Sequence, residues 1–141
     1  MSNYDPNNIF AKILRQEIPC HKVYEDEMTL AFMDVMPQAT GHVLVIGKCE
    51  AVELTDLPLE YATAIIATAQ KVIKAQRVAL NVEGVVQMQL NHAKAGQSVF
   101  HYHMHLIPTH VHELGKHEGG FADQKELAEL AAKIRAVIDT E

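Results

Sequence analysis

The sequence predicts an α+β fold: a five-stranded antiparallel sheet with a long central helix and a C-terminal helix. Short runs of β-branched and aromatic residues alternate with turn residues, and two long segments carry apolar residues at helical spacing. Consecutive strands joined by short turns favour antiparallel pairing, with the helices packed on the sheet. A length of 141 residues suits one domain, so we expect residues 1–141 to form a single unit.

The first half of the chain predicts one short helix and three strands. Residues 9–15 place apolar side chains on one helical face, an asparagine just ahead can cap the helix, and Pro19 should end it. Two strand-like runs, 22–25 and 29–33, flank an acidic turn that suits a hairpin. The β-branched run 42–46, bounded by glycines, is typical of a buried central strand.

The second half predicts the long helix, two more strands and a final helix. Apolar residues recur at helical spacing over 58–80, and Asp56 just ahead is the expected N-cap. Residues 85–90 and 99–108 predict the fourth and fifth strands, with a polar loop between them. A last helical stripe covers 122–138.

Composition argues against several classes of function. The net charge of −6 gives no basic surface for nucleic-acid phosphates. No apolar run is long enough to span a bilayer, and the first residues lack the basic and apolar parts of a leader peptide. The two cysteines lack a Cys-x-x-Cys spacing, which favours reduced thiols. We therefore expect a cytoplasmic protein that binds neither membrane nor nucleic acid.

The stretch 96–108, which reads GQSVFHYHMHLIP, is where the catalytic chemistry is expected. On a strand, alternate side chains share a face about 6.6 Å apart, so His101, His103 and His105 should line one face. The apolar residues between them should face the core. An imidazole can act as nucleophile, proton donor or hydrogen-bond relay near neutral pH, so three on one face predict a catalytic site.

This stretch resembles the signature of the histidine triad (HIT) family, His-φ-His-φ-His-φ-φ with φ apolar, preceded by Gly-Gln-Ser-Val-aromatic. Two further segments, 9–19 and 31–46, resemble the family's opening helix and its hairpin with the third strand. The resemblance covers residues 8–108 and leaves 109–141 as a C-terminal extension. It implies a HIT-like fold and a nucleotide hydrolase or nucleotidyl transferase of the nucleoside phosphoramidase-like branch, acting at the α-phosphate without a cofactor.

The resemblance also implies a role for each histidine. His103 would attack the α-phosphorus and form a nucleotidyl-histidine that water then hydrolyses. His105 would donate to phosphoryl oxygens or to the leaving group, His101 would orient the site, and His42 would relay a hydrogen bond. A neutral imidazole needs an acceptor on its other nitrogen to be a good nucleophile, so we expect a backbone carbonyl beside His103.

A nucleotide-binding set follows from the same resemblance. Asp34 would accept hydrogen bonds from the ribose hydroxyls, and Gln97 and Ser98 would act as neutral donors near the phosphate. Leu90 stands where many relatives carry a polar residue, so Asn91 would take over that contact. The slot for a purine base would be apolar and would consist of Ile9, Phe10, Ile18, Phe32 and Val35.

Two departures from the family pattern indicate which substrate class is preferred and whether a metal is bound. Thr109 replaces an arginine that often follows the triad, which favours a purine nucleoside phosphoramidate over a dinucleoside polyphosphate. Asn8 and Ala11 occupy the positions of a zinc-binding Cys-x-x-Cys found in some relatives, so we expect no bound metal. The residues that have no assigned role are His110, His112 and His117.

Three alternatives stay open at this level. The protein could hydrolyse dinucleoside polyphosphates, or it could bind nucleotides without turning them over and regulate a partner. A His-x-His pair with a third ligand can also hold zinc. Relatives of this size imply a homodimer joined through the long helix and an adjacent strand.

Overall fold

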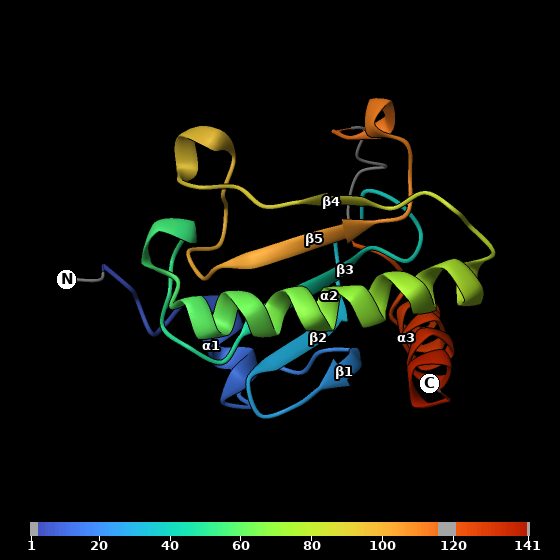
Figure 1. Cartoon of the computed structure of the whole chain (residues 1–141), viewed down its shortest axis with the longest axis horizontal. Helices are drawn as coiled ribbons and strands as arrows, with labels where there is room; N and C mark the ends of the chain where they lie inside the picture. The colour runs from blue at the N-terminus through green and yellow to red at the C-terminus, as the bar shows by residue number, and fades with distance from the viewer. Residues whose placement is uncertain (1–2, 116–120, 141) are drawn as a thin grey trace.

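Five strands form one antiparallel sheet in the computed structural model, which describes residues 3–115 and 121–140. The strand order is β1-β2-β3-β5-β4, and each neighbouring pair is antiparallel. The strands are β1 (Lys22–Glu25), β2 (Thr29–Met33), β3 (Val43–Gly47), β4 (Val86–Met88) and β5 (His103–Ile107). The predicted five-stranded antiparallel sheet is therefore confirmed, and Figure 1 shows its strands in this order.

Three α-helices cover the sheet in the described part of the chain. They are α1 (Ile9–Leu14), α2 (Leu59–Leu80) and α3 (Gln124–Asp139). The long helix α2 runs across one face, with α3 packed beside it, and α1 lies against the opposite face (Figure 1). The predicted long helix and C-terminal helix are confirmed. None of the helices in the described ranges has the length and apolar character needed to cross a membrane.

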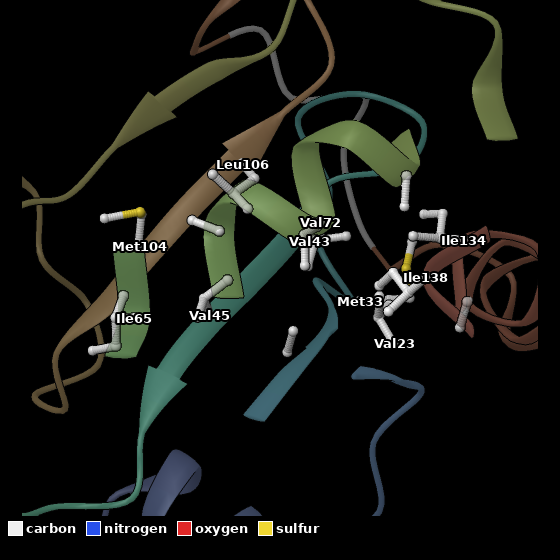
Figure 2. Packing of buried hydrophobic residues seen from close by; sticks show 14 of the residues in the cluster. Val23, Met33, Val43, Val45, Ile65, Val72, Met104, Leu106, Ile134 and Ile138 are labelled. Atoms are coloured by element: carbon white, nitrogen blue, oxygen red, sulfur yellow. The ribbon is translucent and has the colours of Figure 1, made fainter. Parts of the chain in front are cut away.

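The larger core lies between the sheet and the two long helices. Figure 2 shows Val43 and Val45 of β3 beside Met104 and Leu106 of β5, on the side of the sheet that faces α2. The same core continues to α3, and the labelled residues there are Val23, Met33, Ile134 and Ile138. Because burial of one large aliphatic side chain contributes about 1.5–3 kcal/mol, this core fixes β3 and β5 side by side.

The opposite face of the sheet carries a smaller core. Leu44 and Ile46 of β3 point to this face and pack with Phe10 of α1. In the β3–β5 ladder, Leu44 pairs with His105 and Ile46 pairs with His103. Paired residues of neighbouring antiparallel strands share a face, so both histidines lie beside the smaller core and away from α2.

The fifth strand is shorter than predicted. The expected run over 99–108 becomes strand only at His103, because the N–H of Tyr102 donates to the carbonyl of Ala51 at 2.8 Å, outside the ladder. The residues before His103 therefore form a loop held against the segment after β3. The fourth strand, predicted over 85–90, is likewise limited to the three residues of β4.

The prediction that Asp56 caps the long helix is wrong. Pro58 stands at the N-cap position of α2 and makes no side-chain capping bond. The carboxylate of Asp56 instead accepts the N–H groups of Val52 and Glu53, at 2.9 and 2.8 Å. Asp56 thus closes the 3-10 turn Leu54–Asp56, and its position two residues before Pro58 is too early for the N-cap of α2.

The C-terminal extension contacts the turn that follows β2. The N–H of Gly115 donates to Gln38 Oε1 at 2.8 Å, and the N–H of Ala122 donates to the carbonyl of Val35 at 3.0 Å. These two hydrogen bonds therefore hold the turn after β2 against the extension. His117 lies outside the described residues.

Candidate active site

The chain brings three of its histidines together at the β3–β5 pair, on the face of the smaller core. His103 and His105 lie on β5 and His42 directly precedes β3. Ring centroids are 4.9 Å apart for His103 and His105, and 5.2 Å apart for His42 and His105. These three side chains thus form one continuous row of imidazoles.

His101 departs from the predicted strand alternation, because it lies in the loop that leads into β5. Its ring is nevertheless close to the row: Phe10 of α1 makes edge contacts with the rings of both His101 and His103, at 6.4 and 4.9 Å between centroids. The ring of His101 is only 1% exposed. The loop therefore returns this side chain to the same face by a path that strand geometry does not describe.

His103 has one nitrogen held and the other available. Its Nδ1 lies 2.7 Å from the main-chain carbonyl of His101, so Nδ1 carries the proton and donates it to that oxygen. The lone pair therefore sits on Nε2. Burial lowers the pKa of His103, against the opposing effects of the carbonyl bond and of the charge on Asp34. The ring is thus neutral at pH 7, with the nucleophilic nitrogen defined by a backbone acceptor.

The hydrogen positions on His42 and His105 follow from one backbone donor. The N–H of Gln38 points at His42 Nδ1 at 3.1 Å, which makes Nδ1 the acceptor and leaves the proton on Nε2. His42 Nε2 lies 3.0 Å from His105 Nδ1, so it donates to that atom. The remaining proton of His105 then resides on its Nε2. These hydrogen bonds run from Gln38 through His42 to His105 and end in the N–H donor at His105 Nε2. Such a series is consistent with the predicted relay role of His42.

Burial also keeps His105 neutral. It lowers the pKa of His105 to about 4, and the neighbouring His103 and His42 act in the same direction. A neutral ring with Nδ1 occupied by His42 offers a single N–H donor from Nε2. Such a donor can stabilise a phosphoryl oxygen without itself adding a fixed positive charge.

Asp34 lies next to this pair of rings. One carboxylate oxygen, Oδ2, is 3.4 Å from His42 Nε2, and the other, Oδ1, accepts the N–H of Met36 at 2.8 Å. The carboxylate therefore both closes the turn after β2 and stands at the edge of the histidine row. The predicted contact of Asp34 with the ribose hydroxyls stays a prediction.

The predicted apolar slot is divided by the structure. Phe10 and Phe32 are buried and contact each other edge to face at 5.4 Å between ring centroids, and Phe10 also contacts the ring of His103. Ile9 and Val35 are exposed, at 49% and 39%, and Ile18 is half-buried. Only the second group offers open apolar surface.

Gln97 does not have the predicted role of a donor to phosphate in this structure. Its two amide hydrogens go to the carbonyls of Val52 and Val99, at 2.7 and 3.1 Å, and its Oε1 accepts the N–H of His92 at 2.8 Å. Because every hydrogen-bonding position of this buried amide except one lone pair is used, Gln97 holds the loop before the triad. Ser98, beside it, is exposed.

Asn91 likewise connects loops. Its Oδ1 accepts the N–H of Leu54 at 2.9 Å and an amide hydrogen of Gln89 at 3.0 Å. These bonds tie the segment after β4 to the 3-10 turn before α2. The predicted contact to substrate is left to the Asn91 amide hydrogens.

Three ligand-type side chains meet closely enough to hold a metal ion. The ligating atoms of Asp34, His42 and His105 all lie within 4.8 Å of one another. A histidine that binds metal through Nε2 carries its proton on Nδ1 and donates it to an acceptor. Here the group facing His42 Nδ1 is the N–H of Gln38, a donor. The arrangement therefore favours a hydrogen-bond relay over the zinc alternative.

Sequence reasoning missed one side chain at this site, Tyr4. Its hydroxyl lies 2.7 Å from His101 Nδ1, and His101 Nε2 donates to the carbonyl of Gly47 at 2.9 Å. Burial lowers the pKa of His101 to about 4, so this ring too is neutral. No local pattern points to Tyr4, because its contact joins residues 97 positions apart.

Comparisons with known proteins agree with this architecture. A family model described as the HIT domain matches residues 15–117. Protein hit of Bacillus subtilis is 42% identical over 113 residues, which cover 80% of this chain and 75% of the relative. An adenosine 5'-monophosphoramidase of Saccharomyces cerevisiae is 37% identical over 123 residues, 86% of this chain and 75% of the relative. The crystal structure of a Hit-like protein from Bartonella henselae matches with a TM-score of 0.88 and 43% identity, over 96% of this chain and 99% of that one. The chain therefore belongs to the HIT family.

Proposed function

We propose that the protein hydrolyses purine nucleoside phosphoramidates at the α-phosphate through a nucleotide covalently bound to His103. The observation that carries this proposal is the bond from His103 Nδ1 to the carbonyl of His101, which leaves a neutral ring with its lone pair on Nε2. Relatives named adenosine 5'-monophosphoramidase, at 37% and 38% identity, support the substrate class.

In the first step, the Nε2 lone pair attacks the α-phosphorus and the bond from phosphorus to the leaving nitrogen breaks. The amine departs with a proton from solvent, and positive charge develops on the His103 ring. The carbonyl of His101 stabilises that charge, because a hydrogen bond from a charged donor is about twice as strong as a neutral one. In the second step, water adds to phosphorus, loses a proton to solvent, and the electron pair returns to Nε2.

The row of histidines supplies the donor for the phosphoryl oxygens. His105 presents an Nε2–H because His42 occupies its Nδ1, and His42 is oriented by the N–H of Gln38. A preorganised donor of this kind contributes on the order of 10²-fold in rate. Asp34, which lies beside His42 and His105, accepts the ribose hydroxyls in the proposed complex.

The test is a trapping experiment with adenosine phosphoramidate carrying a labelled α-phosphate. Enzyme quenched during turnover should carry an acid-labile adenylyl group on His103, and His103→Ala should keep the fold but lose both the label and the release of AMP. A panel that includes diadenosine polyphosphates separates the phosphoramidate from the polyphosphate alternative. Binding of nucleotide without any label on the enzyme would favour the regulatory alternative.

We also propose that the protein is a homodimer, joined through α2 and β4. Leu59, Ile66 and Ile73 follow one another at intervals of seven residues on α2; Leu59 and Ile66 are exposed and Ile73 is half-buried. Within the described residues β4 pairs only with β5, which leaves one edge of the sheet open. Light scattering should give twice the subunit mass for the wild type and the subunit mass for Ile66→Glu; a monomeric wild type would contradict the proposal.

A further inference from the structure

We infer that Tyr4 is a positioning residue for the triad: its hydroxyl fixes the ring of His101 and, through it, the main-chain carbonyl that orients His103. The predicted effect on rate rests on the proposed function. The effect on the His101 ring does not, and it can be measured without any substrate.

The direction of the Tyr4 hydrogen bond is set by the other nitrogen of His101. Nε2 lies 2.9 Å from the carbonyl of Gly47, an acceptor only, so Nε2 carries the ring proton. Nδ1 is then an acceptor, and the hydroxyl of Tyr4 at 2.7 Å is its donor. In the other tautomer, a lone pair on Nε2 would face the Gly47 oxygen. Tyr4 and Gly47 together therefore select one tautomer and one ring orientation.

The link from this ring to the nucleophile is short. The ring and the carbonyl that accepts the His103 Nδ1 proton at 2.7 Å belong to the same residue, His101. The peptide unit that carries this carbonyl is held by its own N–H, that of Tyr102, which donates to Ala51 at 2.8 Å, and the side chain of His101 is held by Tyr4 and Gly47. Loss of the Tyr4 bond would remove one of these anchors and allow a displacement of His101 that shifts the acceptor of the nucleophilic ring.

Tyr4 is itself held by a structured segment. The N–H of Asn8 donates to the carbonyl of Asp5 at 3.1 Å, and Asn8 Oδ1 accepts the N–H of Ala11 at 2.9 Å as the N-cap of α1. The same segment therefore carries Tyr4 against His101 and Phe10 against His103. The tyrosine and histidine rings also contact edge to face, with centroids 5.6 Å apart.

Tyr4→Phe removes the hydroxyl and keeps the ring. We expect it to slow formation of the adenylyl-enzyme about tenfold, with KM changed less than about twofold, because the ground-state contacts to the nucleotide are not touched. The matched control is Tyr24→Phe, which removes a hydroxyl on β1 that is bonded to Asp26 and Lys71 and should leave both constants unchanged.

The second readout is the protonation pattern of the His101 ring, measured by long-range proton–nitrogen correlation on protein labelled with ¹⁵N-histidine. The wild type and Tyr24→Phe should show only the Nε2–H form of His101 with a hydrogen-bonded Nδ1. In Tyr4→Phe the Nδ1 resonance should move to the position of a free acceptor, or both tautomers should appear. A Tyr4→Phe protein that matches Tyr24→Phe in rate and in spectrum overturns the inference.

Two further outcomes are also decisive. If the wild type forms no adenylyl-enzyme, the proposed function fails, while the spectrum still decides whether Tyr4 fixes the ring. If Tyr4→Phe does not fold, 3-fluorotyrosine at position 4 keeps the ring and strengthens the donor. An unshifted His101 Nδ1 resonance in that protein overturns the inference.

Discussion

Acidification should destabilise the protein through His101, by an amount that follows from its burial. The folded-state pKa of His101 is about 4, against an ordinary value of 6.5, mainly because the ring is buried. Between these two values the unfolded chain binds a proton at this ring and the folded chain does not. The unfolded state is therefore favoured as pH falls from 6.5 towards 4. The linkage relation gives a loss of about 2 kcal/mol between pH 7 and pH 5.

The measurement is urea unfolding at pH 7 and at pH 5, for the wild type and for His101→Gln. Other titrating groups are common to both proteins, so they cancel in the difference. The wild type should lose about 2 kcal/mol more of its unfolding free energy than the variant over this interval. His112→Gln, at an exposed ring, is the matched control and should behave as the wild type. Equal losses in the wild type and His101→Gln would refute the reasoning.

Three other predictions concern the row, the backbone and metal. His105→Ala should lower kcat, because His105 supports the developing charge, whereas Asp34→Ala should mainly raise KM, because Asp34 holds ribose in the proposed complex. Steady-state kinetics separates the two effects, and a fall in kcat alone for both variants would contradict these roles. Gly41→Ala should lower the unfolding free energy by about 1–2 kcal/mol, because Gly41 has φ of +87° and an added Cβ would meet Leu80. Urea unfolding curves compare this variant with Gly84→Ala, where no heavy atom lies within 4 Å of the added Cβ. An unchanged stability of Gly41→Ala would count against this. Extended dialysis against EDTA should leave hydrolysis intact, and loss of activity that returns with stoichiometric zinc would restore the metal alternative.

The parts of the site that the sequence predicted are those governed by local periodicity. The alternation of β5 places His103 and His105 on one face and Met104 and Leu106 on the other, as expected for a strand. For His101 the predicted strand is wrong, because a long-range bond from Tyr102 to the segment after β3 takes the chain out of the ladder, although the ring still reaches the predicted face.

The remaining gaps have the same physical origin. A glutamine beside the triad was expected to contact substrate, but the identity of its partners depends on how Val52 and Val99 approach it in three dimensions. The contact of Tyr4 joins residues 97 positions apart. The N–H of Gln38 lies only four residues from His42, but a main-chain donor is present at every residue except proline and so leaves no signal in the sequence. Residue type and spacing carry no information about such partners.

Several hydrogen bonds that orient the site histidines are insensitive to side-chain substitution. Three of the atoms that orient the rings of His42, His103 and His101 belong to the main chain: the N–H of Gln38 and the carbonyls of His101 and Gly47. Main-chain atoms survive nearly every side-chain replacement, so an alanine scan passes over all three. At position 38 only proline deletes the donor, and for the two oxygens chemical alteration of the backbone is required. These three contacts are therefore protected from ordinary point mutation, whereas the hydroxyl of Tyr4 is not.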